Sequence, residues 1–73
     1  MDYMSKVITV SINGEPRQLH ASTTIASLIE EMGLTGKRIA LERNGGIVPR
    51  STYADQHLSE NDKLEIVVAV GGG

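Results

Sequence analysis

The run of residues 64–70 is the feature of this sequence that most constrains its fold. Apart from Glu65, every residue in it is apolar, and valine and isoleucine predominate. A short continuous apolar run of this kind is typical of a strand that is covered on at least one face. We therefore predict a strand over residues 63–69 and place it in the middle of a sheet, beside the first strand of the chain.

The N-terminal part of the sequence predicts a β-hairpin. Residues 6–12 alternate in character, and Ile8, Val10 and Ile12 form the uniformly apolar, β-branched side that faces the core. Asn13-Gly14 follows, a dipeptide that tolerates positive φ at both positions of a tight turn. Glu15-Pro16 extends this connection, and residues 17–21 form the second strand.

A short amphipathic helix follows the hairpin. Residues 22–24 are Ser-Thr-Thr, whose hydroxyls are suited to the N-cap, and Gly33 suits the left-handed position that ends a helix. Between them, four apolar residues recur at i, i+3, i+4 and i+7, which places them on one face: Ile25, Leu28, Ile29 and Met32. This stripe predicts a helix that packs on the sheet.

The rest of the chain supplies further strands and turns. Residues 38–43 predict a third strand, residues 44–46 a tight turn, and Ile47-Val48 a short edge strand that Pro49 ends. Residues 51–55 predict a capped single turn of helix, and Leu58 is expected in the core. The order β-β-α-β-β-β with a right-handed crossover predicts an α+β, β-grasp (ubiquitin-like) fold, in which one helix crosses a mixed sheet of four to five strands.

Composition narrows the classes of function. The chain has 73 residues, no Cys, no Phe, no Trp and a net charge of −2. This acidic balance argues against nucleic-acid binding. No apolar run approaches the roughly 20 residues that span a bilayer, and residues 1–6 do not resemble a signal peptide. We expect a cytoplasmic protein with no membrane partner, arranged as a loose extension over 1–5, the domain over 6–69 and a flexible tail over 70–73.

No constellation in the sequence is typical of an active site. His20 and His57 lack the companions that a zinc site requires, so no metal is expected. The acidic residues near position 60 lack the spacing of a calcium loop, and Gly45-Gly46 is not followed by the helix and lysine of a phosphate-binding loop. We expect a protein that is not an enzyme and binds no cofactor of its own.

The terminal sequence Val70-Gly71-Gly72-Gly73 offers one reactive group. Glycines can lie extended in a narrow slot of a partner, because they have no Cβ, and they leave the Gly73 α-carboxylate sterically open. The functional interpretation is that a folded domain presents this carboxylate as a reactive group. The alternative is a frayed terminus or residues left by cloning, and the four residues alone do not decide between them.

Several segments together resemble the sulfur carriers of thiamine biosynthesis, the ThiS family. The resemblance rests on Asn-Gly-Gly-Ile-Val-Pro-Arg at 44–50, on Leu58, Asp62 and Glu65-Ile66-Val67, and on the glycine end. It implies that Gly73 is adenylated by a ThiF-type enzyme, which uses ATP, and is converted to a thiocarboxylate with sulfur from a desulfurase system. The sulfur then passes to a ThiG-type thiazole synthase.

The resemblance also implies roles for individual residues and leaves alternatives open. Gly71 and Gly72 would thread into the partner, while Val70, Arg50 and the exposed face of the final strand would contact it. For Arg50, a solvated cation after an edge strand is an equal interpretation. The alternatives are a MoaD-like small subunit of molybdopterin synthase, a ubiquitin-like interaction or conjugation module, and a ligand-binding domain of a larger enzyme.

Overall fold

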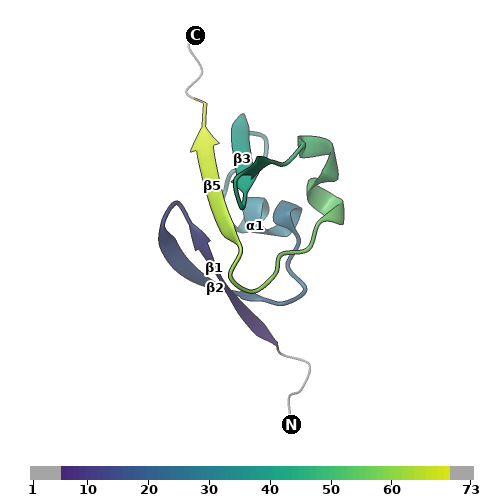
Figure 1. The fold of residues 1–73 in the computed structure, drawn as a ribbon. Coiled ribbons are helices and arrows are strands. Elements are labelled where there is room, and N and C mark those ends of the chain that lie inside the picture. The colour runs from purple at the N-terminus through teal and green to yellow at the C-terminus, as the bar shows by residue number, and fades with distance from the viewer. Residues whose placement is uncertain (1–5, 70–73) are drawn as a thin grey trace.

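The computed structural model describes residues 6–69, which form one sheet with an α-helix packed on it (Figure 1). The expected extension at 1–5 and the expected tail at 70–73 lie outside the described residues. In chain order, the elements are β1 Val7–Ile12, β2 Glu15–His20, α1 Ile25–Glu31, β3 Ile39–Arg43, β4 Gly46–Ile47, the 3₁₀ helix η1 Arg50–Asp55 and β5 Lys63–Val68. The predicted order β-β-α-β-β-β is confirmed.

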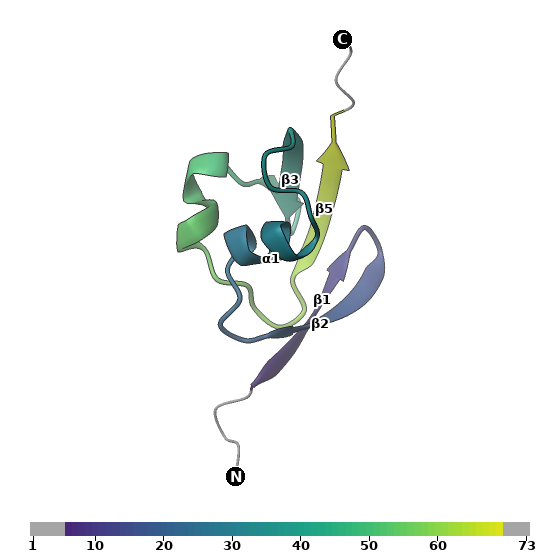
Figure 2. The same ribbon diagram turned by 180° about the vertical axis from the view of Figure 1, so that it is seen from behind.

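The five strands form a mixed sheet in the order β2-β1-β5-β3-β4. The final strand, β5, is central, as predicted: it lies parallel to β1 and antiparallel to β3. The two hairpins, β1–β2 and β3–β4, flank it, and α1 covers one face of the sheet (Figure 2). The chain therefore leaves the described domain along the middle strand of the sheet.

Both hairpins close through an Asn-Gly turn with positive φ at both residues. The φ angles are 52° and 88° at Asn13 and Gly14, and 53° and 89° at Asn44 and Gly45. Because such a two-residue turn matches the twist of the flanking strands, the second strand begins at once. The prediction that Glu15-Pro16 extends the connection is therefore wrong, and both residues belong to β2. A proline is tolerated there because β2 is an edge strand.

The N-cap of α1 determines where the helix begins, and its apolar stripe determines which face packs on the sheet. Thr24 is the N-cap, and its Oγ1 accepts the Ser27 N–H at 3.1 Å. Ile25, Leu28 and Ile29 are buried, and Met32 is the partly buried C-cap before Gly33, whose φ is 72°. The prediction for this segment is confirmed.

The core joins the helix to the central strands. Four of its side chains have no exposed surface at all: Ile25, Leu28, Leu41 and Leu64. Leu58 is buried as expected, and Tyr53 joins the core from η1. The expected capped turn at 51–55 is a 3₁₀ helix that already begins at Arg50, and its N-cap is Pro49, which makes no side-chain cap bond. Proline has no side-chain donor or acceptor with which to cap.

The two turn asparagines also form hydrogen bonds with the backbone of β5, one at each edge of the strand. The Asn13 carboxamide accepts the Ile66 N–H at 2.8 Å and donates to the Ile66 carbonyl at 3.1 Å. Asn44 accepts the Lys63 N–H through its side chain at 2.9 Å and donates its own N–H to the Lys63 carbonyl at 2.7 Å. Each asparagine thus continues the hydrogen bonding of the neighbouring strand where that strand ends.

Candidate functional site

Strand β5 is the described element that is closest in sequence to the predicted reactive carboxylate. The last described hydrogen bond runs from the Ala69 N–H to the Arg38 carbonyl at 2.8 Å. In Figure 1, β5 runs past the tip of the β1–β2 hairpin toward the C-terminus. The predicted site residues Val70, Gly71, Gly72 and Gly73 lie outside the described residues, so the structure defines the strand that leads to them.

Arg50 lies at the same end of the sheet. Its guanidinium donates to the Lys37 carbonyl at 2.7 Å, next to the carbonyl of Arg38 that receives the Ala69 N–H. The side chain therefore ties η1 to the loop before β3 as well as carrying a charge. Lys37, Arg38 and Arg50 are all exposed, which gives this end of the domain three cations. A cleft of about 270 Å³ adjoins them, lined in part by Ile39, Arg50 and Tyr53.

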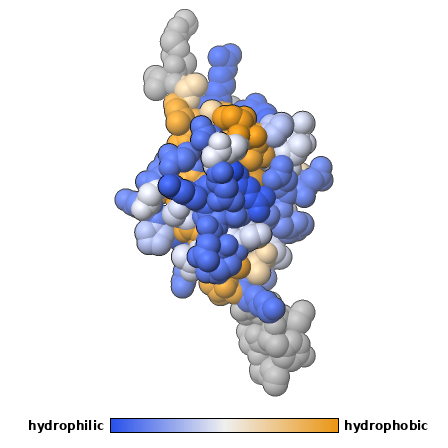
Figure 3. Space-filling model, viewed as in Figure 1, coloured by the Kyte–Doolittle hydropathy of each residue, from blue (hydrophilic) through white to orange (hydrophobic). Residues whose placement is uncertain are grey.

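Apolar side chains are exposed on the face of the sheet that α1 does not cover. Val67 of β5 pairs with Ala40 of β3. Ile47 of β4 pairs with Glu42, the next residue of β3 that faces outward. Val67 is 63% exposed and Ile47 is 67% exposed. Figure 3 shows hydrophobic atoms gathered near the end of β5 in this view. We call Ala40, Ile47 and Val67 the outer-face patch; its position beside the exit of the chain suits a docking surface.

Two glutamates border this patch. Glu42 and Glu65 are directly paired across β3 and β5, an arrangement in which like charges weaken a sheet. Among the described residues, the ion pairs are Arg17–Glu31 and Arg43–Asp62, so neither glutamate is neutralised by one. The outer face thus combines an apolar centre with an acidic border.

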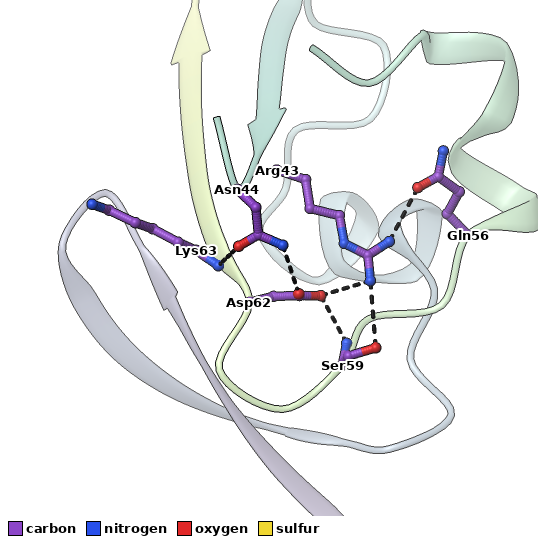
Figure 4. Close-up of polar contacts among 6 residues, drawn as sticks. All are labelled: Arg43, Asn44, Gln56, Ser59, Asp62 and Lys63. Carbon is purple, nitrogen blue, oxygen red and sulfur yellow. Dashed lines mark hydrogen bonds and ion pairs between the residues drawn. The ribbon is translucent and has the colours of Figure 1, made fainter. Parts of the chain in front are cut away.

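Asp62 lies at the opposite end of β5, inside a polar network (Figure 4). Its carboxylate accepts the Asn44 amide at 3.0 Å, the Ser59 N–H at 2.8 Å and the Arg43 guanidinium at 2.8 Å. Burial acts to raise the pKa of Asp62, but these hydrogen bonds and the charge of Arg43 together hold the pKa below its usual value. Both oxygens of the carboxylate accept from donors within the domain, which gives it a structural role.

Nothing in the sequence spacing around Asp62 indicates a buried carboxylate. Its partners Arg43 and Asn44 lie in another hairpin, 18 or 19 positions earlier in the chain. The resemblance to a known family included Asp62, and this was the one signal that singled it out. Asn61, with a φ of 69°, adopts the left-handed conformation that the turn before Asp62 requires.

The two histidines have different neighbours. The His20 Nδ1 lies 2.8 Å from the Ser22 hydroxyl, and His57 is exposed and forms a β-bridge with Thr24. Within residues 6–69, no three His, Cys, Asp or Glu side chains gather as a metal site would require. In the same part of the chain, no helix is long and apolar enough to cross a membrane.

The geometry defines a β-grasp domain whose central strand leads directly to the chain's terminal glycines. A thiamine biosynthesis protein (ThiS) from Geobacter metallireducens has the same fold: the TM-score is 0.76 at 20% identity, over 90% of this chain and all of that one. The sequence profile described as the ThiS family matches residues 10–73. The chain belongs to the ThiS family.

The relatives with higher sequence identity are of two kinds: some are about as long as this chain, and others are about five times as long. A sulfur carrier protein ThiS from Bacillus subtilis is 34% identical over 65 residues, which cover 88% of this chain and 98% of that protein. A thiazole synthase from Paramagnetospirillum magneticum is 48% identical over 62 residues, or 85% of this chain. The chain spans about a fifth of the length of that thiazole synthase and of a second one, from Magnetococcus marinus.

Proposed function

We propose that this protein is a sulfur carrier of thiamine biosynthesis and that the Gly73 carboxylate carries the sulfur. Membership of the ThiS family is the observation that carries the proposal. The similarity to a full-length relative named as a sulfur carrier supports it, as does a β-grasp domain whose central strand leads to the terminal glycines. The carrier acts as a co-substrate, and its partners perform the catalysis in the cytoplasm.

The chemistry follows from the properties of a carboxylate. A carboxylate oxygen is a poor leaving group, so a ThiF-type partner first transfers AMP from ATP to the Gly73 carboxylate and releases pyrophosphate. Hydrosulfide, released from the persulfide of a desulfurase system by a thiol reductant, then attacks the acyl carbon and displaces AMP, which leaves a thiocarboxylate. ATP is bound by the activating partner. Gly71 and Gly72, without side chains, let the tail enter the site of that partner.

Thiazole synthase is the proposed recipient of the sulfur. Proteins named thiazole synthase carry a segment similar to this chain at up to 48% identity, which supports a functional link between the two. The family match also favours this recipient over molybdopterin synthase and over a lysine side chain, the acceptors expected for a MoaD-like subunit or a conjugation module.

The test uses co-expression with a ThiF-type enzyme, followed by alkylation and intact-mass analysis. Exchange of one oxygen for sulfur changes the mass nearly as much as oxidation of one of the three methionines, so mass alone is ambiguous. The chain has no cysteine, and a single adduct with a thiol-selective reagent therefore reports a thiocarboxylate. We expect one adduct on the wild type and none on a chain that lacks Gly73.

Other outcomes separate the alternatives. An unalkylated wild-type chain, under conditions that load a control carrier, would contradict the proposal. Adducts of the chain with lysines of other proteins would indicate a conjugation module. Restoration of a strain deficient in the molybdenum cofactor, but not of one that requires thiazole, would indicate a MoaD-like subunit.

We also propose that the outer-face patch and Arg50 bind the activating partner. Val67→Asp is expected to raise the KM for adenylation about tenfold or more, because a buried, unpaired charge at an interface costs several kcal/mol. Since Val67 is 63% exposed, the melting temperature should change little. Ser22→Asp, which places the same charge on an exposed residue of the loop between β2 and α1, is the matched control. Equal KM values for the two variants would exclude the patch from the interface.

A further inference from the structure

Strand β2 is one of the two edge strands of the sheet, and with six residues it is the longer of them. Within residues 6–69, β1 is its only strand partner. Every residue of β2 except Leu19 is exposed. A cleft of about 410 Å³, lined in part by Glu15, Pro16 and Arg17, adjoins the first half of the strand. A strand edge with exposed backbone and adjoining space is a template for pairing with another strand.

The observed hydrogen bonds show which backbone groups of β2 point to its open edge. The Ala21 N–H, just beyond the strand, donates to the Lys6 carbonyl at 2.8 Å. Because backbone groups alternate between the two edges of a strand, odd-numbered residues of β2 face β1 and even-numbered residues face outward. Thr9 of β1 agrees: it lies opposite Gln18, yet both of its backbone groups bond to residues 60–61. The outward residues are therefore Pro16, Gln18 and His20.

Two of these three residues have only one free backbone group. Pro16 has no N–H to donate. The His20 carbonyl already accepts the Thr23 N–H at 3.0 Å, in the turn that follows β2. The groups free for pairing at this edge are therefore the Pro16 carbonyl, both groups of Gln18 and the His20 N–H.

We propose that this edge of β2 pairs with the same edge of a second copy of the chain, antiparallel and about a two-fold axis through Gln18. Each Gln18 N–H then donates to the Gln18 carbonyl of the other copy, and each His20 N–H donates to the carbonyl of Pro16. The nitrogen of Pro16 lies opposite the His20 carbonyl, which Thr23 already satisfies. The four hydrogen bonds use every free group of both edges.

Other pairings at this edge satisfy fewer groups. A shift of two residues in one direction places Pro16 opposite Gln18, whose carbonyl then has no donor. The opposite shift directs the Gln18 N–H to the His20 carbonyl, which already accepts from Thr23. A strand of another protein would leave a donor opposite His20 and an acceptor opposite Pro16 without a bond. The edge is therefore complementary to itself in one register.

Pairing through β2 also leaves the outer-face patch uncovered. That patch lies on β3, β4 and β5, whereas β2 is at the other end of the sheet. Three successive antiparallel steps separate the two copies of β1, and each β5 is parallel to its own β1. The β5 strands of the two copies therefore run in opposite directions, away from the contact between the copies.

Sedimentation equilibrium of the full chain tests the proposal. Four hydrogen bonds over a small contact area predict a weak dimer, with a Kd of roughly 0.1–1 mM. Gln18→Pro removes the N–H of Gln18 from both edges and should raise the Kd at least tenfold. The strand already holds one outward proline, so the fold should tolerate a second. The control, Gln18→Thr, keeps the N–H and should change the Kd less than about threefold.

Cross-linking gives a second measurement that does not depend on how Gln18→Pro folds. The chain has no cysteine, so Gln18→Cys carries one thiol. The two-fold axis brings the two residues at this position to a Cα separation of about 5.5 Å, and a short bis-maleimide should join them. The control is Ala54→Cys, an exposed position in η1, which lies on the other side of the domain from β2 (Figures 1 and 2). It should give little product.

Several results would overturn the proposal. They are a wild-type chain that stays monomeric at millimolar concentration, equal Kd values for Gln18→Pro and Gln18→Thr, and equal cross-linking at positions 18 and 54. A monomeric chain in which Gln18→Pro raises the KM for adenylation would assign the edge to a strand of the activating partner, and would also overturn it. Sedimentation and cross-linking use this chain alone, so their outcome is independent of the proposed function.

Discussion

Asp62→Ala is expected to destabilise the domain by about 3 kcal/mol, the low end of the range for breaking a buried ion pair. The Asp62 side chain is only 7% exposed, and its loss leaves the half-buried Arg43 guanidinium without a counter-charge. The Asn44 amide and the Ser59 N–H also lose their acceptor. The low end applies because Arg43 is 21% exposed and water replaces part of what it loses.

Urea denaturation at neutral pH measures this effect, with Asp55→Ala as the control. Asp55 is exposed at the end of η1 and carries the same charge, so its removal should change stability by no more than about 0.5 kcal/mol. Similar losses for both variants would show that net charge, and not the network of Figure 4, determines the result.

The same carboxylate predicts an acid dependence with a definite sign. Because the folded state lowers the pKa of Asp62, its contribution to stability is present above the usual value of 3.8 and is lost as the pH falls below it toward the folded pKa. We expect Asp62→Asn to lose less stability than the wild type between about pH 5 and pH 2, because this group no longer binds a proton on unfolding. Parallel curves would contradict the assignment.

The parts of the fold that depend on local pattern could be predicted from the sequence. The Asn-Gly turns require positive φ at neighbouring residues, the helix shows its stripe within eight residues, and the apolar run of β5 indicates a central strand. The sequence predicts a start of β2 that is two residues late, because Pro16 is typical of a connection and not of a strand. The edge position of β2 removes the usual cost of proline in a strand.

The contacts that join distant segments could not be predicted in this way. Asp62 meets Arg43 and Asn44 only after the two flanking segments have packed, and Tyr53 enters the core from a 3₁₀ helix too short to show a periodic pattern. The sequence supports two roles for Arg50 equally, a solvated cation and a partner contact. The hydrogen bond from Arg50 to the Lys37 carbonyl depends on a loop conformation that the sequence spacing does not reveal. The proposed role of the terminal glycines rests on their chemistry and on the family resemblance.

Leu64→Ala is expected to have a comparable or larger effect, about 2–5 kcal/mol, through loss of buried surface and formation of a cavity. Leu64 has no exposed surface and lies in β5 between Ile12 of β1 and Arg43 of β3, where both hairpins join the central strand. A domain of this size has a stability of roughly 4–11 kcal/mol, so one such cavity removes a large share of it. The melting temperature should fall by about 10–30 °C.

Val67→Ala is the matched control, because it shortens a side chain of the same strand that is 63% exposed, and it should cost less than about 1 kcal/mol. Since β5 leads directly to the proposed carrier end, the yield of alkylated thiocarboxylate from Leu64→Ala should follow its folded fraction as the temperature rises. A Leu64→Ala chain that is loaded equally well above its melting temperature would show that the activating partner recognises the tail without the folded domain.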